Sequence, residues 1–230
     1  GMGNQATILS WTGAISSNIF SYSAGAFTPS HVTIADLALK TTVATVTGIR
    51  IVNGGFDTFE NLVFQGITTH FYISGGFRPA LRNILVAGNA PRDAGGSYFA
   101  SMPHIEISGF TSYGTSTATA VLTFDAVAAG TVTNVNMYAP VTIGIIVQGD
   151  CQGLVFTTGV IVSMTRGVQF LLAAAASPTF CQFIGYEFDQ ATVYCAEVVA
   201  GGNLSFTACE FTNSAAGVIF GAQADVIRLR

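Results

Sequence analysis

Acidic residues in the last quarter of the chain carry its most recognisable chemistry. Glu187 and Glu210 occupy the same place in two similar segments, and Asp189 follows Glu187 by two residues. Two carboxylates that flank a sugar can hydrolyse a glycosidic bond, one as the acid and the other as base or nucleophile. The same pattern is typical of a solvated acidic edge. Glu187, Asp189 and Glu210 are therefore candidate catalytic residues, provided that they share one face.

Two tyrosines, Tyr113 and Tyr138, are separated by one repeat of the pattern described below. Exposed aromatic rings bind the apolar faces of sugar rings while polar neighbours take the hydroxyl groups, so this pair is a candidate glycan-binding site. The alternative is an aromatic ladder that stabilises the fold or lies in a contact between subunits.

The segment from Gly88 to Tyr98 is the most loop-like insertion, and it combines two charged residues, Arg92 and Asp93, with an aromatic one, Tyr98. Binding residues gather on loops that a rigid scaffold holds. We expect Arg92, Asp93 and Tyr98 to contribute to binding, unless the segment is a plain connecting turn.

Metal and cofactor chemistry is not indicated. The four cysteines, Cys151, Cys181, Cys195 and Cys209, form no CxxC pair and have no metal-ligand spacing. The three histidines, His31, His70 and His104, share no position in the repeat and are given no role. We therefore expect no metal and no cofactor, and we interpret the cysteines as small buried hydrophobic residues.

These candidates must be positioned by a repeat. Eight six-residue units begin at Ile34, Phe59, Leu81, Ile107, Val132, Thr157, Phe183 and Phe206, at intervals of 22 to 26 residues. The third position of the unit is Asp36, Asn61, Asn83, Gly109, Asn134, Gly159, Gly185 and Ala208. Asx and Gly tolerate the left-handed conformation, which predicts a sharp bend between two short strands in every unit.

The alternation around each bend predicts which side chains point outward. The fifth position places Glu187 and Glu210 on adjacent coils, about 4.8 Å apart at the backbone. The same reasoning predicts that the side chains of six apolar residues also point outward: Val63, Leu85, Ile161, Tyr72, Ile146 and Ile219. Exposed apolar patches are rarely without a function, so we expect partner subunits, or the chain's own loops, to cover them.

Period-two alternation and a predominance of Val, Ile, Thr and Phe exclude a helical repeat. One repeat cannot bury its own apolar face, and stacked repeats can. The sequence thus predicts an all-β, single-stranded parallel β-helix of about eight to nine coils. Residues 1–30 are expected to form an N-terminal rung or cap and residues 31–230 the β-helix itself. Both ends stop in mid-pattern, as in a piece of a longer chain.

The coil length and the Asx/Gly bend, over residues 30 to 225, resemble the right-handed parallel β-helices of the pectin-lyase-like superfamily, which include phage tail-spike and polysaccharide-depolymerase proteins. The resemblance implies a right-handed coil, a homotrimer, and a location in a virion tail or outside cells. The family's polygalacturonase-like motifs, an Asp-Asp pair and Gly-His-Gly, are absent. The lyase motifs are also missing, because Arg78-Pro-Ala-Leu-Arg82 is one residue short of Arg-x-Pro-x-x-Arg.

Composition narrows the function further. Only 9% of residues are charged, the net charge is −4, and half the residues are hydrophobic. A chain with so few basic residues is not expected to bind nucleic acid, and its longest apolar run, Phe170 to Ala176, is too short to span a membrane. Together with these exclusions, the resemblance implies a β-helix module of a phage tail spike or fibre-like protein that recognises host-surface polysaccharide. A polysaccharide depolymerase and a purely structural stalk or adhesin are the alternatives.

Overall fold

The computed structural model describes residues 7–14, 16–24, 31–87, 96–113, 119–138 and 142–230, and within these ranges all regular structure is β-strand. The odd-numbered strands are β1 (Thr7–Trp11), β3 (Thr33–Thr41), β5 (Thr58–Gln65), β7 (Ala80–Val86), β9 (Ile105–Ser112), β11 (Gly130–Met137), β13 (Leu154–Val162), β15 (Gln182–Asp189) and β17 (Glu210–Thr212). The even-numbered strands are β2 (Asn18–Ser23), β4 (Thr47–Val52), β6 (Thr69–Ser74), β8 (Ser97–Met102), β10 (Ala120–Val127), β12 (Ile143–Gln148), β14 (Arg166–Leu171), β16 (Tyr194–Thr207) and β18 (Val218–Leu229).

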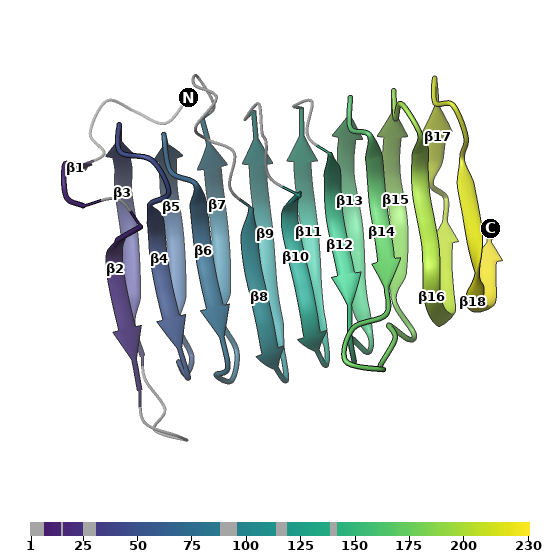
Figure 1. Cartoon of the computed structure of the whole chain (residues 1–230), viewed down its shortest axis with the longest axis horizontal. Helices are drawn as coiled ribbons and strands as arrows, with labels where there is room; N and C mark the ends of the chain where they lie inside the picture. The colour runs from purple at the N-terminus through teal and green to yellow at the C-terminus, as the bar shows by residue number, and fades with distance from the viewer. Residues whose placement is uncertain (1–6, 15, 25–30, 88–95, 114–118, 139–141) are drawn as a thin grey trace.

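Successive turns of the chain lie side by side, which makes a parallel β-solenoid of about eight turns (Figure 1). Each strand pairs in parallel with the strand two places later, so that β3 pairs with β5 and β4 pairs with β6. The predicted all-β parallel coil is confirmed. β1 and β2 continue the same pairing onto β3 and β4.

The long odd-numbered strands bend in the middle, and the bend divides each turn into three faces. The residue at the bend has a positive φ in every turn from β3 to β17, for example Asp36 at 56°, Asn83 at 53° and Gly185 at 63°. Because Asx and Gly adopt this conformation at little cost, their recurrence in the sequence marked the corner correctly.

The sixth unit is the exception, and its predicted register is wrong by one residue. Thr158, with φ 50°, takes the bend, and Gly159 pairs with Val135 on one side and Tyr186 on the other. Gly159 is needed at this position because a Cβ atom there would overlap the backbone oxygen of Val135 and lie 2.6 Å from the Tyr186 ring. The shift turns Ile161 inward, where it is 1% exposed, and Val160 takes the outward position.

The core consists of stacked rows of apolar side chains, one from each turn. Phe156, Phe183 and Phe206 form one such row, with ring centroids 4.2 and 5.5 Å apart. Burying each Phe side chain stabilises the folded chain by about 1.5–3 kcal/mol. Each of the three turns in this row adds one such contribution.

The predicted outward apolar residues divide into two groups. Val63, Leu85, Tyr72 and Ile219 are half-buried. Ile146 is only 5% exposed, in a small outer cluster with Ala120 and Ile143. No partner subunit is required to bury Ile146. Within the described part of the chain, no helix is long and apolar enough to cross a membrane.

Candidate functional site

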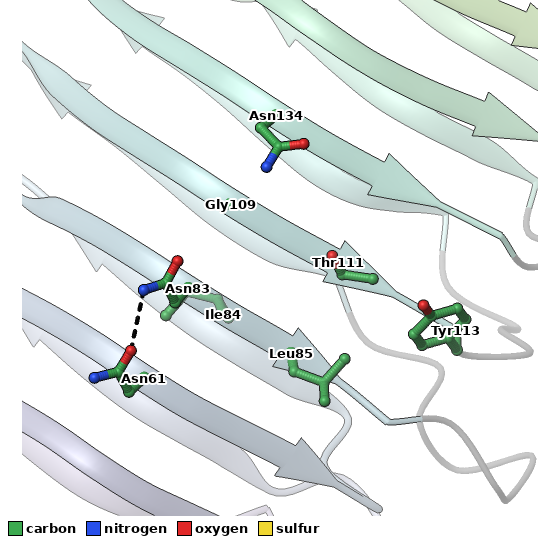
Figure 2. Close-up of a pocket in the computed structure, with 8 residues that line it drawn as sticks. All are labelled: Asn61, Asn83, Ile84, Leu85, Gly109, Thr111, Tyr113 and Asn134. Atoms are coloured by element: carbon green, nitrogen blue, oxygen red, sulfur yellow. Dashed lines mark hydrogen bonds between the residues drawn. The ribbon is translucent and has the colours of Figure 1, made fainter. Parts of the chain in front are cut away.

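A groove of about 530 Å³ crosses four successive turns on the outside of the solenoid (Figure 2). It is lined by Asn61, Asn83, Ile84, Leu85, Gly109, Thr111, Tyr113 and Asn134, from β5, β7, β9, β11 and the residue after β9. None of these eight residues is charged. The groove therefore suits an uncharged ligand with both apolar and polar surfaces.

One side of the groove is a ladder of carboxamides at the bends. Asn61 Nδ2 donates a hydrogen bond to Asp36 Oδ1 at 2.8 Å, and Asn83 Nδ2 donates one to Asn61 Oδ1 at 3.1 Å. Further along, Asn134 Oδ1 accepts a hydrogen bond from Asn136 Nδ2 at 3.1 Å. The bonds of Asp36, Asn61 and Asn83 join neighbouring turns, whereas the bond of Asn134 lies within its own strand. The sequence predicted the bend, but it did not predict these contacts.

The other side of the groove is aromatic. Tyr113 stacks on Tyr138 with ring centroids 5.4 Å apart and an interplanar angle of 14°. The two residues remain 52% and 45% exposed. The predicted stacking on adjacent coils is confirmed. Tyr113 lines the groove together with Thr111 and Leu85, and Tyr138 extends the aromatic platform from Tyr113 onto the next turn.

Tyr98 lies on a different face from Tyr113, the one formed by the even-numbered strands. Its ring stacks on Tyr72 at 5.4 Å, and its hydroxyl donates a hydrogen bond to Asp125 Oδ2 at 2.7 Å. Partial burial and the adjacent carboxylate raise the pKa of Tyr98 well above its usual value. Tyr98, Tyr72, Thr69 and Thr123 help to line a second, smaller groove of about 240 Å³. Arg92 and Asp93 lie outside the described residues.

The three candidate carboxylates lie on β15 and β17, away from both grooves. The register pairs Glu187 with Glu210 on adjacent turns, as the repeat predicted. Asp189 accepts hydrogen bonds from Asn213 Nδ2 at 2.9 Å and Thr212 Oγ1 at 3.1 Å. These bonds lower the pKa of Asp189, so this residue stays ionised and is a poor proton donor. Any acid would have to be Glu187 or Glu210.

One exposed feature escaped the sequence analysis. His31, Phe56 and Phe77 stack along one corner, with centroids 5.5 Å apart for the first pair and 6.0 Å for the second. His31 and Phe56 each stand two residues before the paired Thr33 and Thr58. Extending the repeat alignment three residues upstream of Ile34 and Phe59 would have aligned His31 with Phe56.

Within the described residues, no group of three or more His, Cys, Asp or Glu side chains is placed to hold a metal ion. Cys151, Cys181 and Cys195 are buried and unpaired, and burial raises the pKa of each thiol. In comparisons with known proteins, no family model matches the chain, and no curated protein or solved structure is significantly similar to it.

Proposed function

We propose that the chain is a carbohydrate-binding β-solenoid, the module with which a phage tail-spike or fibre-like protein recognises host-surface polysaccharide. The observation that carries the proposal is the groove that combines the Tyr113–Tyr138 platform with a carboxamide ladder. A sugar ring has apolar C–H faces and polar edges. Aromatic rings bind the former, and carboxamides, which both donate and accept, bind the latter.

The scaffold supports this function because the groove is built on paired strands. The carboxamides and the tyrosines belong to, or directly follow, strands that pair on both edges. Preformed sites lose little conformational entropy when a ligand binds. A location in a virion tail or outside cells, and assembly as a homotrimer, belong to the same proposal and rest on the family resemblance.

Binding to a glycan array tests the proposal. Replacing Tyr113 by Ala removes the outer ring of the platform and should weaken binding on the order of tenfold, which corresponds to about 1.4 kcal/mol. Tyr194→Ala is the matched control, because Tyr194 lies on β16, beneath Arg166 and far along the chain from the groove. Equal affinity of Tyr113→Ala and wild type would remove the platform from the proposal. Absence of any bound glycan would favour a structural stalk.

A polysaccharide depolymerase is the second candidate, and the pairing of Glu187 with Glu210 favours it. Adjacent parallel strands lie about 4.8 Å apart, close to the ~5–5.5 Å between the carboxyl groups of retaining glycosidases. We expect a Glu187→Gln/Glu210→Gln variant to lose all release of reducing ends from a polysaccharide that the wild type cleaves. Unchanged cleavage by the double variant would eliminate this pair as the catalytic residues.

A further inference from the structure

The carboxamide ladder has a direction, and Asp36 sets it. A carboxylate only accepts hydrogen bonds, so Asn61 must present its nitrogen to Asp36 and its oxygen to the next turn. Asn83 then presents its nitrogen to Asn61 and directs its own oxygen further along the solenoid. The orientation of these two amides thus follows from the chemistry of Asp36.

The ladder is interrupted at Gly109. This residue occupies the bend of the next turn with φ 73°, and it has no side chain to continue the chain of hydrogen bonds. Asn83 Oδ1 lies 3.0 Å from the place where a Cβ atom of residue 109 would be. Figure 2 shows this oxygen pointing toward the strand that carries Gly109. The near side of the gap is therefore a hydrogen-bond acceptor.

The far side of the gap is a donor. Asn134 Oδ1 accepts a hydrogen bond from Asn136 Nδ2. Asn134 Nδ2 is therefore directed to the opposite side. In Figure 2 this nitrogen points toward the strand of Gly109. Asn83 and Asn134 lie two turns apart, about 10 Å at the backbone.

The group that fits this gap must donate at one end and accept at the other, and it must be as long as the missing side chain. In the intact part of the ladder, one carboxamide and one hydrogen bond fill each turn. A secondary amide has the same N–H and C=O groups on two separate atoms. A lone hydroxyl group would have to make both hydrogen bonds, each about 2.8 Å long, from a single oxygen atom. It therefore bridges a shorter gap than a secondary amide does.

We propose that the Gly109 gap is the subsite for the N-acetyl group of an amino sugar, whose amide completes the ladder. The inference rests on the proposed glycan-binding function. The acetamido N–H donates to Asn83 Oδ1, and its carbonyl oxygen accepts from Asn134 Nδ2. Tyr113 directly follows β9, the strand that carries Gly109, and lies four residues from Gly109, about 13 Å along an extended chain. A neighbouring sugar ring of the same oligosaccharide therefore reaches Tyr113.

The test compares Gly109→Asn with Gly185→Asn. Asparagine already adopts the required conformation at positions 61, 83 and 134, so it is compatible with both backbones. At position 109 the new Cβ atom displaces Asn83 Oδ1 by a few tenths of an ångström, and the new carboxamide donates to this oxygen and closes the gap. Gly185 occupies the equivalent bend on β15, outside the groove, and nothing lies within 4 Å of a Cβ atom there. Asn134→Gly, which removes the donor and keeps a residue suited to the bend, is the second test variant.

The probes are an array of oligosaccharides in which each N-acetylated member is matched by the same molecule with a hydroxyl group. The β-1,4-linked trimers of N-acetylglucosamine and of glucose are titrated in solution. We expect wild type and Gly185→Asn to bind the acetamido members at least about tenfold more tightly, because only these members make both hydrogen bonds across the gap. Gly109→Asn and Asn134→Gly should lose this preference.

Two results would overturn the inference: equal binding of matched acetamido and hydroxyl members by wild type, or an unchanged preference in Gly109→Asn. If wild type binds acetamido and hydroxyl members equally and Tyr113→Ala abolishes the binding of both, the proposed function stands and only the inference fails. If wild type binds no member of the array and neither trimer, the proposed function fails and the inference fails with it.

Discussion

At the scale of single residues, the core contains polar side chains without hydrogen-bond partners. His70, at the second position of β6, is 1% exposed, and its ring packs edge-on against Phe64 with centroids 5.5 Å apart. Among the described residues, neither ring nitrogen has a hydrogen-bond partner. Burial disfavours the charged imidazolium and lowers the pKa of His70 from 6.5 to about 3. His70 is therefore neutral in the folded protein.

The buried imidazole predicts a pH-dependent stability. The unfolded chain takes up a proton on His70 below pH 6.5 and the folded chain does not, so stability is present above pH 6.5 and falls as the pH is lowered toward 3. We expect the free energy of unfolding in urea to decrease by about 2 kcal/mol from pH 7 to pH 5 through this residue. In His70→Phe the free energy of unfolding should decrease by about 2 kcal/mol less over the same pH range, because the titrating imidazole is absent. Identical pH dependence in both proteins would contradict the burial argument.

At the scale of the strands, the corners depend on residues that tolerate positive φ. The bend in the odd-numbered strands is one such corner, and a second lies at the ends of the even-numbered strands β4 to β12, at Asn53, Gly75, Ser101, Ala126 and Gly149. Alanine in the left-handed region costs about 1 kcal/mol or more, because its Cβ atom approaches the following carbonyl oxygen. The pairing of the strands on both sides of the corner offsets this cost.

Ala208, with φ 51°, provides a test of the corner. Replacement by Gly removes the steric penalty at the bend, and we expect the free energy of unfolding to rise by roughly 0.5–1 kcal/mol after the greater flexibility of Gly in the unfolded chain is included. Ala196→Gly is the control. Ala196 is fully buried within β16, and its φ is not positive, so the same substitution should destabilise by about 1 kcal/mol. A loss of stability in both variants would show that the bend carries no strain at Ala208.

At the scale of the whole molecule, the solenoid presents different surfaces along its length. The groove lined by Tyr113 crosses β5 to β11, the carboxylate pair lies on β15 and β17, and the stack of His31, Phe56 and Phe77 follows one corner near the N-terminal turns. Phe56 and Phe77 are 47% and 48% exposed. We propose that subunits of a homotrimer, which the family resemblance implies, meet along this aromatic corner, whose three residues do not line the groove.

Light scattering after size exclusion measures the assembly directly. The monomer has a mass of 23.9 kDa, and we expect a particle of three times that mass. A Phe56→Ser/Phe77→Ser variant should shift the particle toward the monomer, because the exposed rings would lose the apolar area that they bury between subunits. Replacing Tyr113 by Ala should leave the mass unchanged. A monomeric wild type would exclude the trimer.

Much of the architecture could be predicted from local pattern. Apolar alternation on both sides of an Asx or Gly residue, repeated every 22 to 26 residues, defined the bend, the inward rows, the stacking of Tyr113 on Tyr138 and the alignment of Glu187 with Glu210. These features depend on residue type and spacing within one turn, because each turn contacts its neighbours through the same positions.

The sequence by itself determined the repeat, the parallel stacking and the row to which most side chains belong. Only the tertiary structure decided features that depend on which residue lies one turn away. Gly159 is required at its position because the two neighbouring turns leave no space for a Cβ atom, a volume match that no pattern within the unit reveals. The gap at Gly109 likewise exists only because Asn83 and Asn134 lie on the turns before and after it. Asp36, two turns before Asn83, fixes which atom of the Asn83 amide faces the gap. Hydrogen bonds and packed volumes are properties of pairs, and the folded coil alone brings these pairs together.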